Sequence, residues 1–268
     1  MYPNVLLNII NQYLKFIDGE LLYTFKVNIE FNLEGGILVY QDKIYISDSY
    51  GNCVHILDKH GNFIKKFGHH GSNNGEFKFP YSLTLLNNQI YVIDCVNERV
   101  QVFDLDGNYI KMFRYGNNDL NTIGSFTNIS SSQDKIYVTD WNYNRIQVFS
   151  SDNIFLKYIL IKIDLFICNG PHSMIIFNNH IYIIRYHSKF VKIYNMDGIL
   201  NNEILLYTYP TGIAGYGNLI YVSCDKHIEV YHKNGQFVKT WKFRHGSGIY
   251  IQDDLCYLVY NNIISVYR

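Results

Sequence analysis

The chain has 268 residues, and three things are scarce in it: 4 prolines, 5 cysteines and no surplus of either charge. Lys+Arg and Asp+Glu both total 23, which argues against a dedicated nucleic-acid binder, because such proteins rely on cationic contacts with phosphates. No apolar run approaches the roughly 20 residues that span a bilayer, so we expect no membrane partner. The first residues also lack the basic start and the unbroken apolar stretch of a signal peptide.

The cysteines are widely spread and include no C-x-x-C pair. This spacing gives neither the usual zinc pattern nor a disulfide framework, and it favours a reducing compartment, the cytoplasm. The chain also lacks G-x-S-x-G, phosphate-loop and H-E-x-x-H motifs, so we expect no catalytic residue, no metal and no cofactor. Abundant Ile, Asn and Tyr, whose codons are AT-rich, indicate an AT-biased genome.

A short apolar motif recurs six times along the chain, with successive copies 46, 46, 45, 39 and 36 residues apart. Each copy contains four short strand patterns separated by Asn- and Gly-rich turns, and the last one lacks its fourth strand. Four strands in about 40 residues are typical of a β-propeller blade, so we predict an all-β, six-bladed β-propeller with four antiparallel strands per blade. The copies are Ile44–Asp48, Ile90–Asp94, Ile136–Asp140, Ile181–Arg185, Ile220–Cys224 and Cys256–Tyr260.

The flanking residues resemble the NHL repeat family. Residues 67–80 look like its glycine-spaced linker, and residues 94–103 and 140–149 match its core motif. The resemblance covers residues 36–268, strongly in three blades. The other blades depart from the motif: Arg185 and Phe190 replace its Asp and Arg in the fourth, and the fifth and sixth shorten the connection. The first blade departs once, with Cys53 in place of Arg. This resemblance implies partner recognition through the loops on one face of the ring.

We expect two parts, an N-terminal helix or cap over residues 1–19 and the propeller over residues 20–268. Residues 20–26 read as a single strand that completes the last blade and closes the ring, since an unpaired edge is an aggregation liability. The alternative is an open or five-bladed ring with a frayed C-terminus. Residues 3–14 have helical spacing and faintly resemble the opening helix of an F-box, although a cap packed on the propeller is favoured.

Two kinds of functional residue are expected on the loop face. Asp94 with Arg99, and Asp140 with Arg145, are predicted to form ion pairs that hold their turns. Exposed aromatic and basic side chains are predicted to bind a partner. These partner-binding candidates are Tyr81, Trp141, Tyr143, His172, Arg185, Tyr186, Lys189 and Arg244.

The function expected from these features is a non-catalytic, monomeric, cytoplasmic scaffold that binds a protein partner. The alternative is single-stranded RNA binding on a basic rim, with Trp141, Tyr143 and Tyr186 stacking on bases. Two interpretations are less favoured. One is a metal-dependent lyase or hydrolase, since some NHL-like propellers and their relatives have these activities, and the other is an F-box-like ubiquitin-ligase adaptor. The family's lyases are secretory and disulfide-bonded, and this sequence has neither property.

Overall fold

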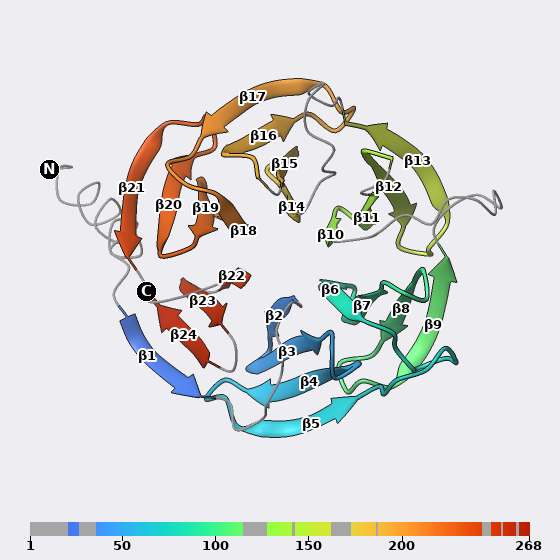
Figure 1. Ribbon diagram of the computed structural model, residues 1–268. Coiled ribbons are helices and arrows are strands. Elements are labelled where there is room, and N and C mark those ends of the chain that lie inside the picture. Colours follow the sequence, from blue (N-terminus) through green and yellow to red (C-terminus); the bar gives the residue numbers. More distant parts are fainter. Residues whose placement is uncertain are drawn as a thin grey trace, which may run out of the picture.

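The computed structural model describes residues 21–26, 36–114, 128–140, 143–161, 173–185, 187–242, 248–252, 254–260 and 263–268. Six four-stranded sheets surround a central channel as the blades of a propeller (Figure 1), which confirms the predicted fold class. The helix predicted within residues 1–19 lies outside the described ranges. Among the described residues, no helix has the length and apolar character needed to cross a membrane.

The strands of each blade run outward from the channel in chain order (Figure 1). Blade one contains β2 (Ile37–Tyr40), β3 (Lys43–Asp48), β4 (Cys53–Asp58) and β5 (Phe63–Phe67). Blade two contains β6 (Pro80–Leu86), β7 (Gln89–Asp94), β8 (Arg99–Phe103) and β9 (Tyr109–Arg114). Blade three contains β10 (Ile129–Ser132), β11 (Lys135–Asp140), β12 (Arg145–Ser150) and β13 (Phe155–Leu160).

The remaining blades repeat this arrangement, and the last one borrows its outer strand from the other end of the chain. Blade four contains β14 (Ser173–Phe177), β15 (His180–Ile184), β16 (Phe190–Tyr194) and β17 (Leu200–Leu205). Blade five contains β18 (Pro210–Tyr216), β19 (Leu219–Cys224), β20 (His227–His232) and β21 (Phe237–Lys242). Blade six contains β22 (Gly248–Gln252), β23 (Leu255–Tyr260), β24 (Ile263–Tyr267) and β1 (Leu21–Lys26).

Two-residue turns join the first and second strands of blades one to four. Both residues of each turn have positive φ, as in Asn87 (52°) and Asn88 (56°), and this is the pattern of a type I′ hairpin. Asn and Asp occupy most of these positions because their short polar side chains tolerate the left-handed region. Such tight turns fix the register of each of these four hairpins and therefore which face of each strand carries the apolar side chains.

The hydrophobic core lies between the blades, in six clusters that each join two neighbouring blades. Side chains alternate along a strand, so successive residues of β3 pack in opposite directions. Ile44 and Ile46 contact blade six, whereas Tyr45 packs against blade two. Each fully buried side chain of this size contributes about 1.5–3 kcal/mol relative to an exposed one. The motif that recurs in the sequence is therefore the packing layer of the ring.

The ring is closed by β1, which pairs antiparallel with β24 in the register Thr24↔Ser265 and Phe25↔Ile264. Blade six thus has four strands, although the C-terminal part of the chain supplies only three of them. The described N- and C-terminal segments lie side by side at this point (Figure 1). This is the position that the sequence predicts for residues 20–26, and the complete ring excludes the open and five-bladed alternatives.

Candidate functional site

Each blade carries three residues at the junction between its second and third strands, and we call these three the junction triad. They are the residue that ends or directly follows the second strand, the first residue of the third strand, and the residue two positions later. The first two are paired in register in blades one, two, three and six, as with Asp94↔Arg99, and the third is on the same side of its strand as the second. The triads from blade one to blade six are Asp48, Cys53 and His55; Asp94, Arg99 and Gln101; Asp140, Arg145 and Gln147; Arg185, Phe190 and Lys192; Cys224, His227 and Glu229; Tyr260, Ile263 and Ser265.

In blade two the triad is a buried ion pair that anchors the preceding linker. Arg99 Nε donates to Asp94 Oδ2 at 2.7 Å, and Gln101 Nε2 donates to the same oxygen at 3.1 Å. Arg99 Nη2 donates to the carbonyl oxygens of Asn73 and Glu76, each at 2.7 Å. Arg99 is only 2% exposed. Its guanidinium therefore satisfies the buried carboxylate and fixes the loop that leads into β6.

In blade three the same pair is present with a more exposed arginine. Arg145 Nε donates to Asp140 Oδ2 at 2.7 Å, and its side chain is 17% exposed. The guanidinium carbon lies 4.7 Å from the ring centroid of Tyr143 and 4.0 Å from that of Tyr158. Tyr143 is thus occupied by a cation–π contact within its own blade. Trp141, the neighbouring candidate, lies outside the described residues.

In blade four the carboxylate of the triad is replaced by a cation. Arg185 is 4% exposed, and its Nε and Nη2 have no hydrogen-bond partner in the described part of the chain. Lys189 Nζ donates to the carbonyl of Tyr207 at 3.2 Å and lies 5.4 Å from the ring centroid of Tyr209. Because Arg145 and Arg185 are largely covered by protein, they do not form the exposed basic rim expected from the sequence.

Blade one replaces the arginine and glutamine by Cys53 and His55, both buried beside Asp48. His55 Nε2 lies 3.3 Å from Asp48 Oδ2 and 3.5 Å from Cys53 Sγ. Burial, reinforced by the Asp48 carboxylate, raises the pKa of the Cys53 thiol to about 11. Alone, this thiol is therefore protonated at neutral pH, so it is no ready nucleophile.

Blade five carries a related set on a shorter connection. Glu229 Oε1 lies 2.9 Å from His227 Nε2 and 3.5 Å from Cys224 Sγ, and Tyr231 Oη donates to Glu229 Oε2 at 2.5 Å. Glu229 is fully buried, whereas the His227 side chain is 20% exposed. Burial raises the pKa of the Cys224 thiol to about 12.

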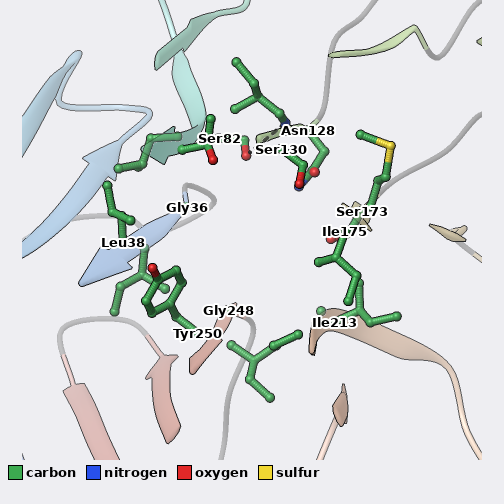
Figure 2. A pocket seen from close by; sticks show the side chains of 18 of the residues that line it. Gly36, Leu38, Ser82, Asn128, Ser130, Ser173, Ile175, Ile213, Gly248 and Tyr250 are labelled. Atoms are coloured by element: carbon green, nitrogen blue, oxygen red, sulfur yellow. Dashed lines mark hydrogen bonds between the residues drawn. The ribbon is translucent and has the colours of Figure 1, made fainter. Parts of the chain in front are cut away.

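The first strands of all six blades surround a central cavity of about 570 Å³ (Figure 2). This is within the roughly 300–1,000 Å³ of typical small-molecule sites. Leu38, Ile175 and Ile213 supply apolar surface. The labelled residues of the lining come from every blade. Its polar residues include Tyr81, Ser82, Asn128, Ser130, Ser173 and Tyr250.

Several hydroxyl groups of the channel also link neighbouring blades. Ser82 Oγ accepts from the backbone N–H of Ile129 at 3.3 Å, and Ser130 Oγ accepts from that of Ile176 at 3.3 Å. Tyr81 lines the channel, and its ring stacks on that of Phe79 with centroids 6.3 Å apart. No charged side chain lies in the described lining. The channel therefore offers neutral hydrogen-bonding groups on a rigid frame.

Of the partner-binding candidates expected from the sequence, Tyr81 lines this cavity, and most of the other lining residues are not among those candidates. The period-2 alternation of the first strands divides their residues into two sets that face opposite sides of the strand. It does not indicate which of the two sets faces the axis of the ring. Sequence analysis also overlooks His55, although Cys53 and His55 have the i, i+2 spacing that places both on one side of a strand. His172, Tyr186 and Arg244, three further partner-binding candidates, lie outside the described residues.

Comparison with known proteins supports the propeller over most of the chain. A family model described as a 6-bladed beta-propeller matches residues 28–118. Among curated proteins, no sequence match is found. A streptogramin B lyase structure is 14% identical, with 92% of this chain and 97% of that chain covered and a TM-score of 0.68.

Two further solved structures have the same ring. A virginiamycin B lyase from Staphylococcus aureus is 16% identical, with 86% of this chain and 78% of that chain covered and a TM-score of 0.63. A gluconolactonase from Xanthomonas campestris is 12% identical, with 91% of this chain and 88% of that chain covered and a TM-score of 0.69. At these identities the similarity establishes the fold alone.

These neighbours correct the function expected from the sequence. A non-catalytic scaffold for a protein partner, with RNA binding as the alternative, is contradicted because the ring is shared along most of its length with lyases and a lactonase. The error has a physical origin. Blade sequences report the packing between sheets, which is common to binding and enzymatic propellers, and carry little information on what occupies the channel.

Proposed function

We propose that the central channel is the functional site and that it binds an uncharged organic molecule. The observation that carries this proposal is the 570 Å³ cavity, whose described lining combines apolar side chains with hydroxyl and amide groups and contains no charged side chain. An ionised ligand in this channel would lose its hydration without gaining a charged partner, which is costly. A neutral molecule with several hydrogen-bonding groups fits better.

The rigidity of the site supports binding in a defined orientation. Ser82 Oγ and Ser130 Oγ accept hydrogen bonds from backbone N–H groups of neighbouring first strands, and these bonds hold the lining in place. Thr84 Oγ1 and Ser131 Oγ form a further link at 3.0 Å. Each hydroxyl oxygen retains acceptor capacity, because it has two lone pairs. A preformed site avoids much of the entropic cost of ordering side chains when the ligand binds.

A second candidate function is catalysis on such a ligand, by elimination or hydrolysis. The three fold neighbours favour it, since two are lyases of streptogramin-type compounds and one is named for a lactone. A lactone is a cyclic molecule, and such a ring suits a wide channel whose described lining carries no charged side chain. The NHL-type assignment is also a proposal, supported by the Asp–Arg–Gln triads of blades two and three. Cys53, Cys224 and Cys256 are free thiols, which favours the cytoplasm.

The test measures thermal stabilisation of the purified protein by gluconolactone, virginiamycin B and charged compounds of similar size. A ligand present at 100 times its Kd stabilises the folded state by about 2.7 kcal/mol, which gives a measurable rise in Tm. We expect stabilisation by a neutral compound and none by the charged ones. Mass spectrometry of the same mixtures tests catalysis, because elimination leaves the mass unchanged in a linear isomer and hydrolysis adds one water.

The substitution Ser130→Phe fills part of the channel and is expected to abolish the rise in Tm. The matched control is Lys157→Phe on the outer strand of the same blade, where the side chain is exposed and far from the lining. If Ser130→Phe leaves ligand binding unchanged while Lys157→Phe behaves as the parent protein, the channel is not the site. Failure of every neutral compound to bind overturns the proposed ligand class.

A further inference from the structure

Two junction triads share a composition that the others lack. Blades one and five each contain one cysteine, one histidine and one carboxylate, at the same three positions but in a different order. The order is Asp48, Cys53, His55 in blade one and Cys224, His227, Glu229 in blade five. Sulfur, imidazole nitrogen and carboxylate oxygen are the ligand atoms that zinc prefers in proteins. The same ligand set is thus built twice, by different substitutions.

The spacing in blade one matches the coordination sphere of zinc. With Zn–S near 2.3 Å and Zn–N and Zn–O near 2.0–2.2 Å, tetrahedral geometry separates S from N by about 3.6 Å and N from O by about 3.4 Å. Cys53 Sγ lies 3.5 Å from His55 Nε2, and His55 Nε2 lies 3.3 Å from Asp48 Oδ2. The ligand atoms of the three residues all lie within 4.8 Å of one another. To hold one ion, the remaining pair, Cys53 Sγ and Asp48 Oδ2, must come from a separation of at most 4.8 Å to about 3.6 Å.

Blade five is similar but tighter. Cys224 Sγ lies 3.5 Å from Glu229 Oε1, close to the separation of about 3.6 Å that zinc requires. His227 Nε2 lies 2.9 Å from the same oxygen, which is hydrogen-bond distance, so the imidazole must move by a few tenths of an ångström. The 20% exposure of His227 gives an ion a path from solvent.

We propose that the junction triads of blades one and five each bind a zinc ion in place of the arginine–aspartate pair of blades two and three. Charge balance supports this assignment: a zinc ion with one thiolate, one carboxylate and a neutral imidazole is neutral overall, as is Asp94 with Arg99. On binding, the thiol proton passes to solvent and the three side chains replace three of the ion's waters.

The role of the metal follows from the burial of its ligands. All three ligands of blade one are buried, so that site is closed to substrates and its zinc ties the second strand to the third. The site of blade five is open at His227 and exchanges its metal faster with chelators. The competing arrangement is a metal-free imidazole–carboxylate pair in each blade, which holds the same side chains together by hydrogen bonds alone.

The decisive measurement is the zinc content of the full chain, purified under reducing conditions, incubated with zinc and freed of excess metal. We expect two equivalents per chain for the parent protein, one for Cys53→Ser and one for Cys224→Ser. The control Cys256→Ser removes a buried cysteine outside both triads and keeps two. Zinc below about a tenth of an equivalent in the parent protein overturns the proposal, and a variant that keeps both equivalents overturns it for its own blade.

A second variant covers failure of the serine substitutions to fold. The double change Cys53→Arg with His55→Gln recreates in blade one the triad of blade two, and it is expected to remove one zinc without lowering the metal-free Tm. Titration of the unmodified protein with Co²⁺ needs no variant. Thiolate-to-cobalt charge-transfer absorption supports coordination by cysteine, and its absence at saturating Co²⁺ establishes the metal-free pair instead.

Discussion

Arg99 Nε lies 2.7 Å from Asp94 Oδ2, and both side chains are almost completely shielded from solvent. The pair connects β7 to β8 within blade two and, through Arg99 Nη2, connects both to the linker at Asn73 and Glu76. The pair therefore fixes the linker that leads into β6, the first strand of the same blade. Where the pair is altered, in blades one, four, five and six, this link must be made in another way.

Removal of the guanidinium by Arg99→Leu leaves the Asp94 carboxylate buried without a counter-charge. We expect a loss of about 3–5 kcal/mol of unfolding free energy, measured by urea denaturation. The matched change Arg145→Leu is expected to cost less, because Arg145 is 17% exposed and water reaches its partner more easily. An equal cost at the two positions contradicts this account of burial.

The recurring tyrosines of the blades predict how stability responds to alkaline pH. Burial raises the pKa of Tyr45 to about 12 and raises the pKa of its equivalents in the next four blades. The contribution of these buried tyrosines to folding stability is complete below their unfolded-state pKa of about 10. It is lost as the pH rises through their higher folded-state pKa values, because tyrosines of the unfolded chain ionise first. The equivalent residues are Tyr91, Tyr137, Tyr182 and Tyr221.

We therefore expect the protein to remain folded at pH 9 and to unfold cooperatively above pH 10. Tyrosinate absorbance and the far-UV circular dichroism of the sheets are measured on the same samples. The part of the absorbance change that belongs to the buried tyrosines should coincide with the change in dichroism. Tyrosinate formation by these buried residues near pH 10 with an unchanged dichroism spectrum would show that water reaches them in the folded ring.

The closing ladder between β1 and β24 predicts a specific sensitivity to proline. Thr24→Pro removes a backbone N–H in the middle of the strand, whereas Thr24→Ala keeps it. We expect the proline variant to be less stable than the alanine variant, because the proline ring fixes φ and crowds the pairing with β24, and we expect the alanine variant to lose under about 1 kcal/mol. Limited proteolysis provides the readout, since β1 released from blade six becomes a cleavage site. Equal protection of the two variants argues against closure by β1.

Alanine substitutions at two glycines of the linker between blades one and two distinguish the cost of steric overlap from the cost of a left-handed backbone. Gly68 and Gly75 both have φ of +82°. A Cβ on Gly68 overlaps the ring of Phe77, whereas a Cβ on Gly75 meets only Tyr109 Cβ, at 3.8 Å. We expect Gly75→Ala to cost about 1–2 kcal/mol for the left-handed backbone and Gly68→Ala about 1–3 kcal/mol more. Thermal unfolding of both variants measures the difference, and equal costs rule out the overlap.

The sequence predicts the ring well because its packing is periodic. Ile44, Tyr45 and Ile46 alternate between two neighbours, and this alternation is visible in every copy of the motif. The lining of the channel is harder to infer, because the direction that Ser130 or Tyr250 faces depends on the curvature of six assembled sheets. The triads of blades one and five need knowledge of register, since Asp48 and Cys53 become neighbours only when β3 pairs with β4.

The pairing of residues 21–26 with residues 263–267 also determines when the ring is completed during synthesis. The two partners of this ladder are separated by most of the chain, so β1 emerges from the ribosome long before β24 exists. Until then β1 has no strand to pair with and blade six is absent. We therefore expect the pairing of β1 with β24 to be a late, long-range step of folding that follows the other five blades. Until β24 is available, the apolar strand β1 must not pair with another strand.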